Sequence, residues 1–220
     1  MGRGESVVVP HEFTFDPAKH EYRLGGRLLP SVGQVLKGMG LIHEGSEEAM
    51  RRGKAIHTAI ALLARGRLDW STVSDAILPY LTAYETFAGH AKFRPSRIEE
   101  PMYHMVYDFA GTPDLIGMVG DELWIVEVKS GQKEAWHELQ TGAYLLLVES
   151  GRKEFIKRVG LYLDKFGNYS LWPHTNYYDG QTFLAFLTAW RWTHGNGDSG
   201  RLEAPGNGVE AQGGGPGGPG

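Results

Sequence analysis

Four consecutive apolar residues, Leu123-Trp124-Ile125-Val126, constrain the fold of this chain more than any other feature of its sequence. A strand with one face in water alternates apolar and polar residues, but this run is apolar on both faces. Such strands are typical of the centre of a sheet that helices cover on both sides. We therefore expect an α/β fold in which residues 122–128 form a central strand.

Hydrophobic periodicity predicts the elements around this strand. Period-two patterns bounded by turn residues indicate strands, and apolar residues three or four positions apart indicate helices. Ser31 and Ser46 are placed as the N-caps of the first two helices. The expected elements, in chain order, are a hairpin at 13–24, helices at 31–37, 47–65 and 71–88, strands at 98–107, 111–119 and 122–128, a helix at 133–149, strands at 159–163 and 169–172, and a helix at 182–192.

This order predicts a single domain over residues 1–195, with a mixed central sheet flanked by helices and an N-terminal helical region at 31–90. Residues 196–220 are rich in glycine and proline and end in GGGPGGPG. Such a segment buries too little apolar surface to offset the entropy of ordering it, so it is predicted to be a disordered tail. No apolar run approaches the ~20 residues that span a bilayer, so no membrane partner is expected.

The absence of cysteine narrows the chemistry of the chain. It excludes disulfides, thiol nucleophiles, thiolate zinc sites and iron–sulfur clusters. A metal in this chain must therefore be held by oxygen and imidazole ligands. A cytoplasmic location is expected, or the host cytoplasm if the chain is encoded by a phage.

Charge alone does not decide whether the partner is a nucleic acid. The net charge is −4, which by itself argues against one. Basic residues nevertheless gather locally, at 51–54, 65–67 and 152–158. Carboxylates that hold a cation are also neutralised by it, so the overall balance understates how well the surface accepts a polyanion.

Charged residues around the apolar strand are the strongest functional signal. Asp114 lies near the start of one predicted strand and Glu127 near the end of the next, with a tight Gly120-Asp121 turn between them. Antiparallel pairing places these two carboxylates near each other at one edge of the sheet. Glu127 and Lys129 are two residues apart, so both side chains project from the same face.

Two carboxylates and an ammonium are the groups that metal-assisted hydrolysis of a phosphodiester needs. Carboxylates hold Mg²⁺ or Mn²⁺, which lowers the pKa of bound water, and a lysine orients that water. The backbone carbonyl of Val128 is a candidate further oxygen ligand. An isolated Glu-x-Lys is more often the solvated face of an edge strand. Here it ends a strand that is predicted to be central, where charged residues are typical of a ligand site.

The same residues resemble the signature of a known nuclease superfamily. Pro113-Asp114 followed by Glu127-Val128-Lys129 resembles the PD-(D/E)XK pattern. Gln140 and Tyr144 match the Q-x-x-x-Y motif of its RecB-like exonuclease branch, which includes phage exonucleases and the mitochondrial genome maintenance exonuclease. The resemblance implies a restriction-endonuclease-like fold, a metal-dependent cleavage of DNA, and an active site at these residues.

Further upstream, three segments resemble the same branch. Gly53 to His57 is similar to its helical G-x-x-x-H, whose histidine is a metal ligand, and Glu99 falls where the family has another acidic residue. Glu100 is the competing register, and Glu99 is preferred from its spacing to the following strand residues. Leu29-Pro30-Ser31-Val32 is similar to a segment ahead of the helical region, although Gly33 stands where those proteins have threonine.

The resemblance implies a role for each residue. His57, Asp114, Glu127 and the Val128 carbonyl would hold the principal cation, and Glu99 would contact a second cation or a metal-bound water. Lys129 would position the nucleophile, Gln140 would orient Lys129 or the scissile phosphate, and Tyr144 would support Gln140. The residues expected to contact DNA are Arg51, Arg52, Lys54 and Ser31.

Each of these motifs taken alone is more often structural than functional, so the interpretation depends on their occurring together and in order. An exonuclease acting on single-stranded or duplex ends is favoured, with residues 31–90 as an arch through which a strand passes. The expected partners are DNA with free ends and other replication or recombination proteins. The alternatives are a catalytically silent DNA-binding or assembly module, a structure-specific endonuclease, and an RNA-directed nuclease.

Overall fold

The computed structural model describes residues 12–43, 45–149 and 155–195. Its elements are, in chain order, β1 (Phe13–Asp16), β2 (Glu21–Leu24), β3 (Arg27–Leu29), α1 (Val32–Gly38), α2 (Glu47–Ala64), a 3₁₀ turn η1 (Trp70–Thr72), α3 (Leu78–Ala91), β4 (Arg94–Ile98), β5 (Met102–His104), β6 (Phe109–Gly111), β7 (Leu115–Val119), β8 (Glu122–Lys129), α4 (Trp136–Glu149), β9 (Ile156–Leu163), β10 (Tyr169–Pro173) and α5 (Asp179–Gly195). The predicted tail at 196–220 lies outside the described residues.

The apolar run lies in β8, at the centre of a five-stranded sheet with the order β10-β9-β8-β7-β4. β8 pairs in parallel with β9, while the other neighbours in the sheet are antiparallel. The parallel pair requires a crossover between its two strands, and α4 provides it. The sheet is therefore mixed, as predicted from the order of the elements.

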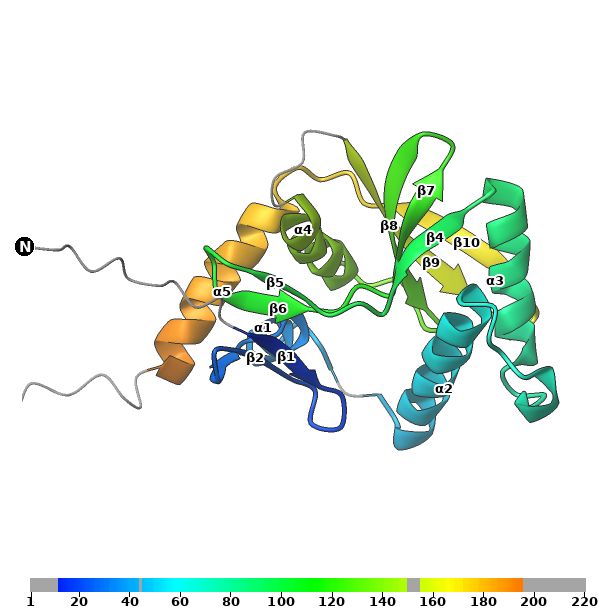
Figure 1. Cartoon of the computed structure of the whole chain (residues 1–220), viewed down its shortest axis with the longest axis horizontal. Coiled ribbons are helices and arrows are strands. Elements are labelled where there is room, and N and C mark those ends of the chain that lie inside the picture. Colours follow the sequence, from blue (N-terminus) through cyan, green and yellow to red (C-terminus); the bar gives the residue numbers. More distant parts are fainter. Residues whose placement is uncertain (1–11, 44, 150–154, 196–220) are drawn as a thin grey trace, which may run out of the picture.

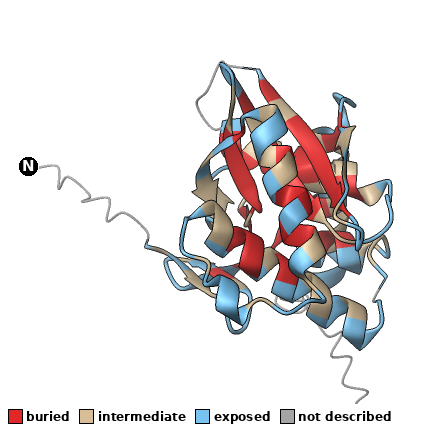
Figure 2. Cartoon of the chain, turned by 90° about the vertical axis from the view of Figure 1, so that its right-hand side faces the viewer, coloured by how far each residue is buried: buried red, intermediate tan, exposed pale blue. Residues whose placement is uncertain are grey.

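Helices cover both faces of this sheet, which explains why β8 is apolar on both sides (Figure 1). Val126 and Val128 face a core that also contains α2 and α3. Leu123 and Ile125 face a second core built with α1, α4 and α5. Figure 2 shows the buried strands of the sheet between exposed helix surfaces. The predicted α/β fold with a helix-flanked mixed sheet is confirmed.

The N-terminal hairpin and β3 form a separate three-stranded sheet with the order β1-β2-β3. A parallel bridge between Ser31 and Ala110 attaches the chain after β3 to the short β5-β6 pair. Tyr22, Leu29 and Ala110 are buried together in a third small core. This sheet is thereby fixed next to the segment that leads from β6 into β7.

Three predicted elements differ from the structure. The strand expected at 98–107 is divided into β4 and β5, because Glu99 has a φ of +48° that ends β4. The strand expected at 111–119 is divided into β6 and β7, with the proline of Thr112-Pro113-Asp114 between them, which has no N–H for a sheet ladder. The helix expected at 71–88 begins only at Leu78, where Pro79 occupies the first turn.

The first residues of α1 and α2 follow their N-caps. The Ser31 hydroxyl accepts from Gln34 N–H, and the Gln34 side chain accepts from Ser31 N–H, a reciprocal capping box that starts α1. The Ser46 hydroxyl accepts from Ala49 N–H and starts α2. None of the helices in the described part of the chain is long and apolar enough to cross a membrane.

Candidate active site

Strand register brings the first two candidate residues together. Leu115 of β7 is opposite Val126 of β8, so the residues just beyond this pair, Asp114 and Glu127, adjoin at one end of the sheet. Asp114 Oδ2 also accepts a hydrogen bond of 2.7 Å from Val128 N–H. Both carboxylates are buried, with Asp114 8% and Glu127 3% exposed. The backbone therefore fixes the Asp114 carboxylate at the end of the central strand.

Lys129 completes this group from the same face of β8. Its Nζ donates to Glu127 Oε1 at 3.1 Å and to Gln140 Oε1 at 2.8 Å. It also lies 4.9 Å from the centre of the Trp136 ring, an arrangement that favours a cation. The ammonium is thus held in one position by two acceptors and an aromatic face.

The crossover helix α4 supplies the groups that orient Lys129. Gln140 accepts from Lys129 through Oε1 and donates through Nε2 to the Tyr144 hydroxyl at 3.1 Å. Tyr144 lies one turn after Gln140 and is buried. Burial, followed by the charges of Glu127 and Asp114, raises the pKa of Tyr144 well above its usual value, so the hydroxyl stays protonated.

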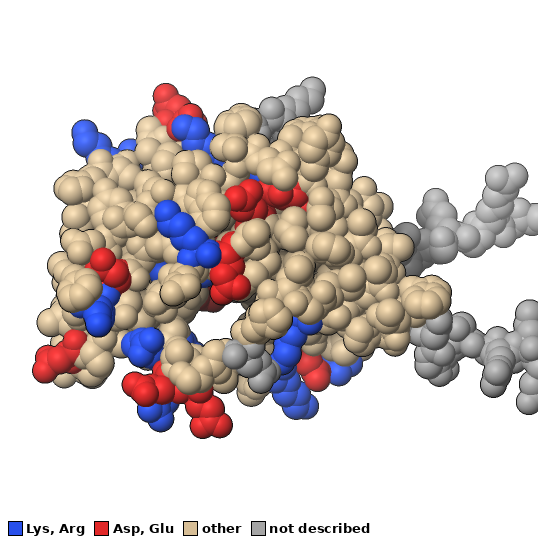
Figure 3. All heavy atoms as spheres, turned by 180° about the vertical axis from the view of Figure 1, so that it is seen from behind, with Lys and Arg blue, Asp and Glu red and all other residues tan. Residues whose placement is uncertain are grey.

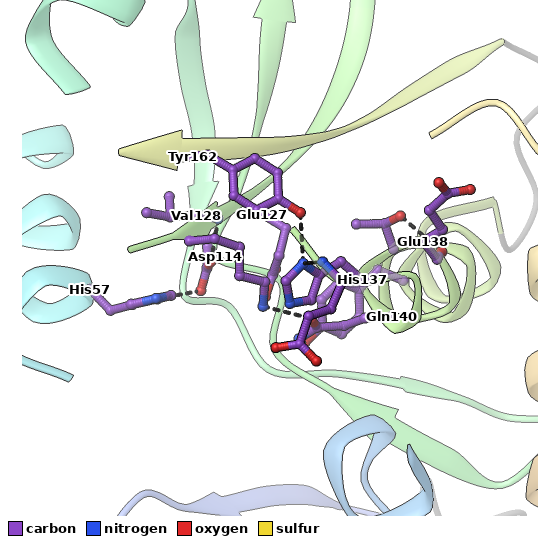
Figure 4. Close-up of polar contacts among 12 residues, drawn as sticks. His57, Asp114, Glu127, Val128, His137, Glu138, Gln140 and Tyr162 are labelled. Atoms are coloured by element: carbon purple, nitrogen blue, oxygen red, sulfur yellow. Dashed lines mark hydrogen bonds and ion pairs between the residues drawn. The ribbon is translucent and has the colours of Figure 1, made fainter. Parts of the chain in front are cut away.

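His57 reaches the same group from the opposite side (Figure 4). It lies in the middle of α2, and its Nδ1 is 3.0 Å from Asp114 Oδ1. Asp114 attracts the protonated imidazole and raises the pKa of His57 to about 9. Burial acts to raise the pKa of Asp114, but His57 and Lys129 outweigh it and hold that pKa below its usual value.

Glu99, and not Glu100, lies in this cluster. Glu99 N–H donates to Asp114 C=O at 2.9 Å, and its φ of +48° is uncommon for a residue with a side chain. Such backbone strain occurs preferentially at functional sites. Glu100 is exposed and lies 3.9 Å from Arg97. Of the two registers, the structure places Glu99 beside His57 and Asp114, and Glu100 outside this group.

The cluster fits a divalent cation. Ligand atoms of His57, Glu99 and Asp114 all lie within 4.8 Å of one another. Among the described residues, the buried Glu127 Oε2 has no hydrogen-bond partner, which is costly for a carboxylate unless a ligand binds there. Carboxylate oxygens and an imidazole are both common donors to divalent cations in proteins.

Crowding of carboxylates leaves two of them partly protonated near neutral pH. Burial, together with the neighbouring charge of Asp114, raises the pKa of Glu99 to about 7 and that of Glu127 to about 7. A cation that binds this cluster must displace protons, because its ligands are the deprotonated forms. Three carboxylates this close together repel one another when they are ionised. Binding of a cation would compensate this buried negative charge.

A cavity of about 710 Å³ opens in front of the cluster. This volume lies in the range of sites that bind nucleotides and other small ligands. Figure 3 shows an opening through the molecule with acidic side chains at its edge and basic side chains close by. The residues that line the cavity include all of His57, Glu99, Asp114, Glu127, Lys129, Gln140 and Tyr144.

The residues expected to contact DNA are placed differently from one another. Lys54 lines the cavity, whereas Arg51 lines a second, smaller pocket on the flank of α2. Arg52 has a buried Nε and lines neither of these two pockets. Ser31 also lines the main cavity, but it is buried and its hydroxyl oxygen caps α1. Of the four residues, Lys54 is therefore the best placed to contact DNA bound in the main cavity.

The sequence analysis did not identify Arg65, the residue at the C-cap of α2, which lines the cavity. Its guanidinium donates to the carbonyl oxygen of Ile98, the residue before Glu99. Arg65 follows His57 by eight residues, and positions four and eight residues apart lie on one face of a helix. This spacing was the signal that could have identified it.

The sequence matches one family profile. Residues 70–169 match that of the PD-(D/E)XK nuclease superfamily. This segment contains Glu99, Asp114, Glu127 and Lys129, together with the α4 motif, but not His57. No curated protein matches the chain as a relative.

Two solved structures of one enzyme, an alkaline exonuclease from Laribacter hongkongensis, resemble this fold. The first is 12% identical, with a TM-score of 0.42 over 76% of this chain and 87% of that one. The second, a complex with dAMP, is 13% identical, with a TM-score of 0.42 over 76% and 88% of the two chains. At TM-scores under 0.5, this likeness adds nothing to the assignment of a function.

Proposed function

We propose that this chain, whose residues 70–169 match the profile of the PD-(D/E)XK nuclease superfamily, is a metal-dependent deoxyribonuclease that acts as an exonuclease of the RecB-like branch. One observation carries the proposal. Asp114, Glu127 and Lys129 converge at the end of the central strand, with the buried Glu127 Oε2 unpartnered among the described residues. A structural ion pair would not require an unsatisfied buried carboxylate oxygen.

Each residue has a defined task in this proposal. His57, Glu99, Asp114 and Glu127 hold one or two cations, and the carbonyl of Val128 is a further ligand. A bound Mg²⁺ or Mn²⁺ lowers the pKa of water and neutralises charge on the phosphate. Lys129 donates a hydrogen bond that orients the attacking water, and its charge stabilises the developing negative charge. Gln140 holds Lys129 in place, and Tyr144 holds Gln140.

Basic residues on α2 are proposed to bind the DNA backbone. Lys54 of α2 and Arg65 at the C-cap of this helix line the cavity, before and after His57 in the sequence. They would neutralise the phosphates that flank the scissile bond, because such contacts position the strand without reading its sequence. Arg51, Arg52 and Ser31 are secondary candidates for the same role.

Action at DNA ends is supported by the helical region and the opening beside the acidic side chains (Figure 3). Residues 31–90 contain α1, α2 and most of α3. In the proposed arrangement a single strand passes through this opening and meets the carboxylates inside. The described elements act in this proposal as one nuclease domain, with free-ended DNA and other replication or recombination proteins as partners. The proposed location is the cytoplasm.

One assay tests the proposal. End-labelled single-stranded and duplex DNA should be degraded by the wild-type chain with Mg²⁺ or Mn²⁺ and be untouched with EDTA. Lys129→Ala should lose activity by roughly 10²–10³-fold, as for other groups that stabilise transition-state charge. Full cleavage by Lys129→Ala would refute the catalytic role assigned to Lys129.

The substrate form separates exonuclease action from the alternatives. A circular single strand should resist the enzyme, because it has no end to pass through the opening. Cleavage of the circle at the rate of the linear strand would favour an endonuclease. Binding of DNA with no cleavage under either cation would favour a silent DNA-binding module.

A further inference from the structure

The cavity has an aromatic wall that the proposed chemistry does not use. Phe15, His20 and Tyr22 of the N-terminal hairpin line it together with the cluster of carboxylates. Figure 1 shows the hairpin and α2 as separate elements of the chain, and residues of both contribute to the cavity lining. The wall belongs to the β1-β2-β3 sheet, whereas Glu127 belongs to β8 of the five-stranded sheet.

The turn between β1 and β2 holds the ring of His20 at the edge of the cavity. Asp16 Oδ1 accepts from the N–H groups of Ala18 and Lys19, at 2.9 and 3.2 Å, and this closes the turn. His20 then has a φ of +53°, in the left-handed region that few side chains adopt. This backbone turns the His20 ring back toward the hairpin, where its Nε2 lies 3.4 Å from the Tyr22 hydroxyl.

The rings of the wall are ordered by contacts with one another. Phe15 stacks on Tyr22 with the ring centres 4.6 Å apart, and His20 stands edge-on to both. Desolvation lowers the pKa of His20 below its usual value, so the imidazole is a neutral ring at pH 7. A neutral aromatic surface suits a nucleobase better than it suits a phosphate.

A hydrogen bond joins this wall to the carboxylates. The Tyr22 hydroxyl lies 2.8 Å from Thr112 Oγ1, two residues before Asp114. Lys54 of α2 and Arg65, the residue at the C-cap of this helix, line the same cavity. The cavity therefore has both aromatic and basic lining residues, which match the bases and the phosphates of a single nucleic-acid strand.

We propose that Phe15 and His20 form a stacking surface for an unpaired nucleobase of the strand whose phosphate lies at the carboxylate cluster. The inference rests on the proposed function, because it assumes that a DNA strand occupies this cavity. In this proposal the hairpin binds the base, and the basic residues at α2 contact the phosphate backbone of the DNA. Since every base has an aromatic face, this stacking does not depend on the DNA sequence.

Single-residue variants remove the wall without unfolding the chain. His20→Gly deletes the ring and suits the left-handed backbone. Phe15→Leu retains apolar packing against the small N-terminal core but loses the flat ring. Thr14→Ala is the matched control, because Thr14 is exposed on the opposite side of β1 and does not line the cavity.

The decisive experiment combines these variants with abasic DNA. Fluorescence anisotropy measures the Kd of a short single strand, with Ca²⁺ as the cation, for intact DNA and for strands with one abasic position near the end. Wild type and Thr14→Ala should bind the intact strand roughly ten-fold more tightly than the strand that is abasic at the stacked position. His20→Gly and Phe15→Leu should bind both strands with nearly equal Kd.

The outcomes separate this inference from the proposed function. Equal preference for the intact strand in wild type and both hairpin variants would overturn the stacking surface, whatever the cleavage assay shows. Loss of the preference in these variants, combined with no cleavage by wild type, would retain the stacking surface and reject the nuclease chemistry. No binding of DNA by wild type would overturn both. In the cleavage assay, His20→Gly should raise KM and leave kcat unchanged.

Discussion

Replacing Glu127 by glutamine should stabilise the metal-free protein at alkaline pH while it abolishes cation binding. The Glu127 carboxylate is buried, and within the described structure its Oε2 has no hydrogen-bond partner. Burial and the charge of Asp114 raise its pKa from 4.5 to about 7, although Lys129 attracts it. Ionisation of Glu127 in the folded state is therefore unfavourable, and glutamine has no charge to bury.

The sign of the pH dependence follows from proton binding. Between pH 4.5 and about 7 the folded state keeps a proton on Glu127 that the unfolded state has lost, so folding stability falls as the pH rises through this window. One pKa unit corresponds to about 1.4 kcal/mol, so the shift from 4.5 to about 7 corresponds to roughly 3 kcal/mol. The stability of Glu127→Gln relative to wild type should thus increase by roughly 2 to 3 kcal/mol between pH 5 and pH 8.

Urea unfolding in EDTA at several pH values measures this difference. Glu122→Gln is the matched control on the same strand, because Glu122 is exposed and pairs with Lys157 at 2.7 Å. Its stability relative to wild type should not increase with pH. Parallel pH dependences for Glu127→Gln and wild type would refute the reasoning that Glu127 is a buried carboxylate poised for a cation.

Three further predictions concern the surroundings of this carboxylate. Calorimetric titration with Mn²⁺ at pH 7.5 should release protons, because the pKa of His57 is about 9 and its imidazole must be neutral to bind; equal heats in buffers of different ionisation enthalpy would contradict this. Gln140→Ala should lower kcat by roughly 10- to 100-fold with little change in KM, since it only positions Lys129; an equal change in KM would indicate a direct contact with DNA. Gly160→Ala should destabilise the fold by roughly 1 to 3 kcal/mol in thermal unfolding, because its Cβ would lie 2.7 Å from the Tyr162 ring. The control is Gly89→Ala in α3, where a Cβ would meet open space, and it should stabilise the fold by roughly 0.5 to 1 kcal/mol. A larger loss of stability in Gly89→Ala than in Gly160→Ala would contradict the packing argument.

The placement of Asp114 beside Glu127 could be predicted because it depends only on local features. A tight turn fixes the register of two neighbouring strands, and the register fixes which side chains adjoin. The caps at Ser31 and Ser46 were predictable for the same reason, since a cap is a contact within one turn of helix. The apolar run placed β8 at the centre of the sheet without knowledge of its neighbours.

Features that depend on distant parts of the chain were not predictable. The turn at Glu99 interrupts a run that alternates like a strand, and only its hydrogen bond to Asp114 shows why the chain bends there. The aromatic wall depends on how the N-terminal sheet docks, through a contact between Tyr22 and Thr112, 90 residues apart. The late start of α3 did have a signal in Pro79, which fits only the first turn of a helix.

The parallel pairing of β8 and β9 has a consequence for how the site forms during folding. The crossover helix α4 follows β8 closely in the sequence. The hydrogen bonds among Glu127, Lys129, Gln140 and Tyr144 therefore each join residues at most eleven positions apart. His57 and Asp114 are separated by 57 residues. Closing a short loop costs less conformational entropy than closing a long one, so contacts between residues near in sequence form earlier. Opening of α2 alone would therefore remove the imidazole, while Lys129 keeps its bonds to Glu127 and Gln140.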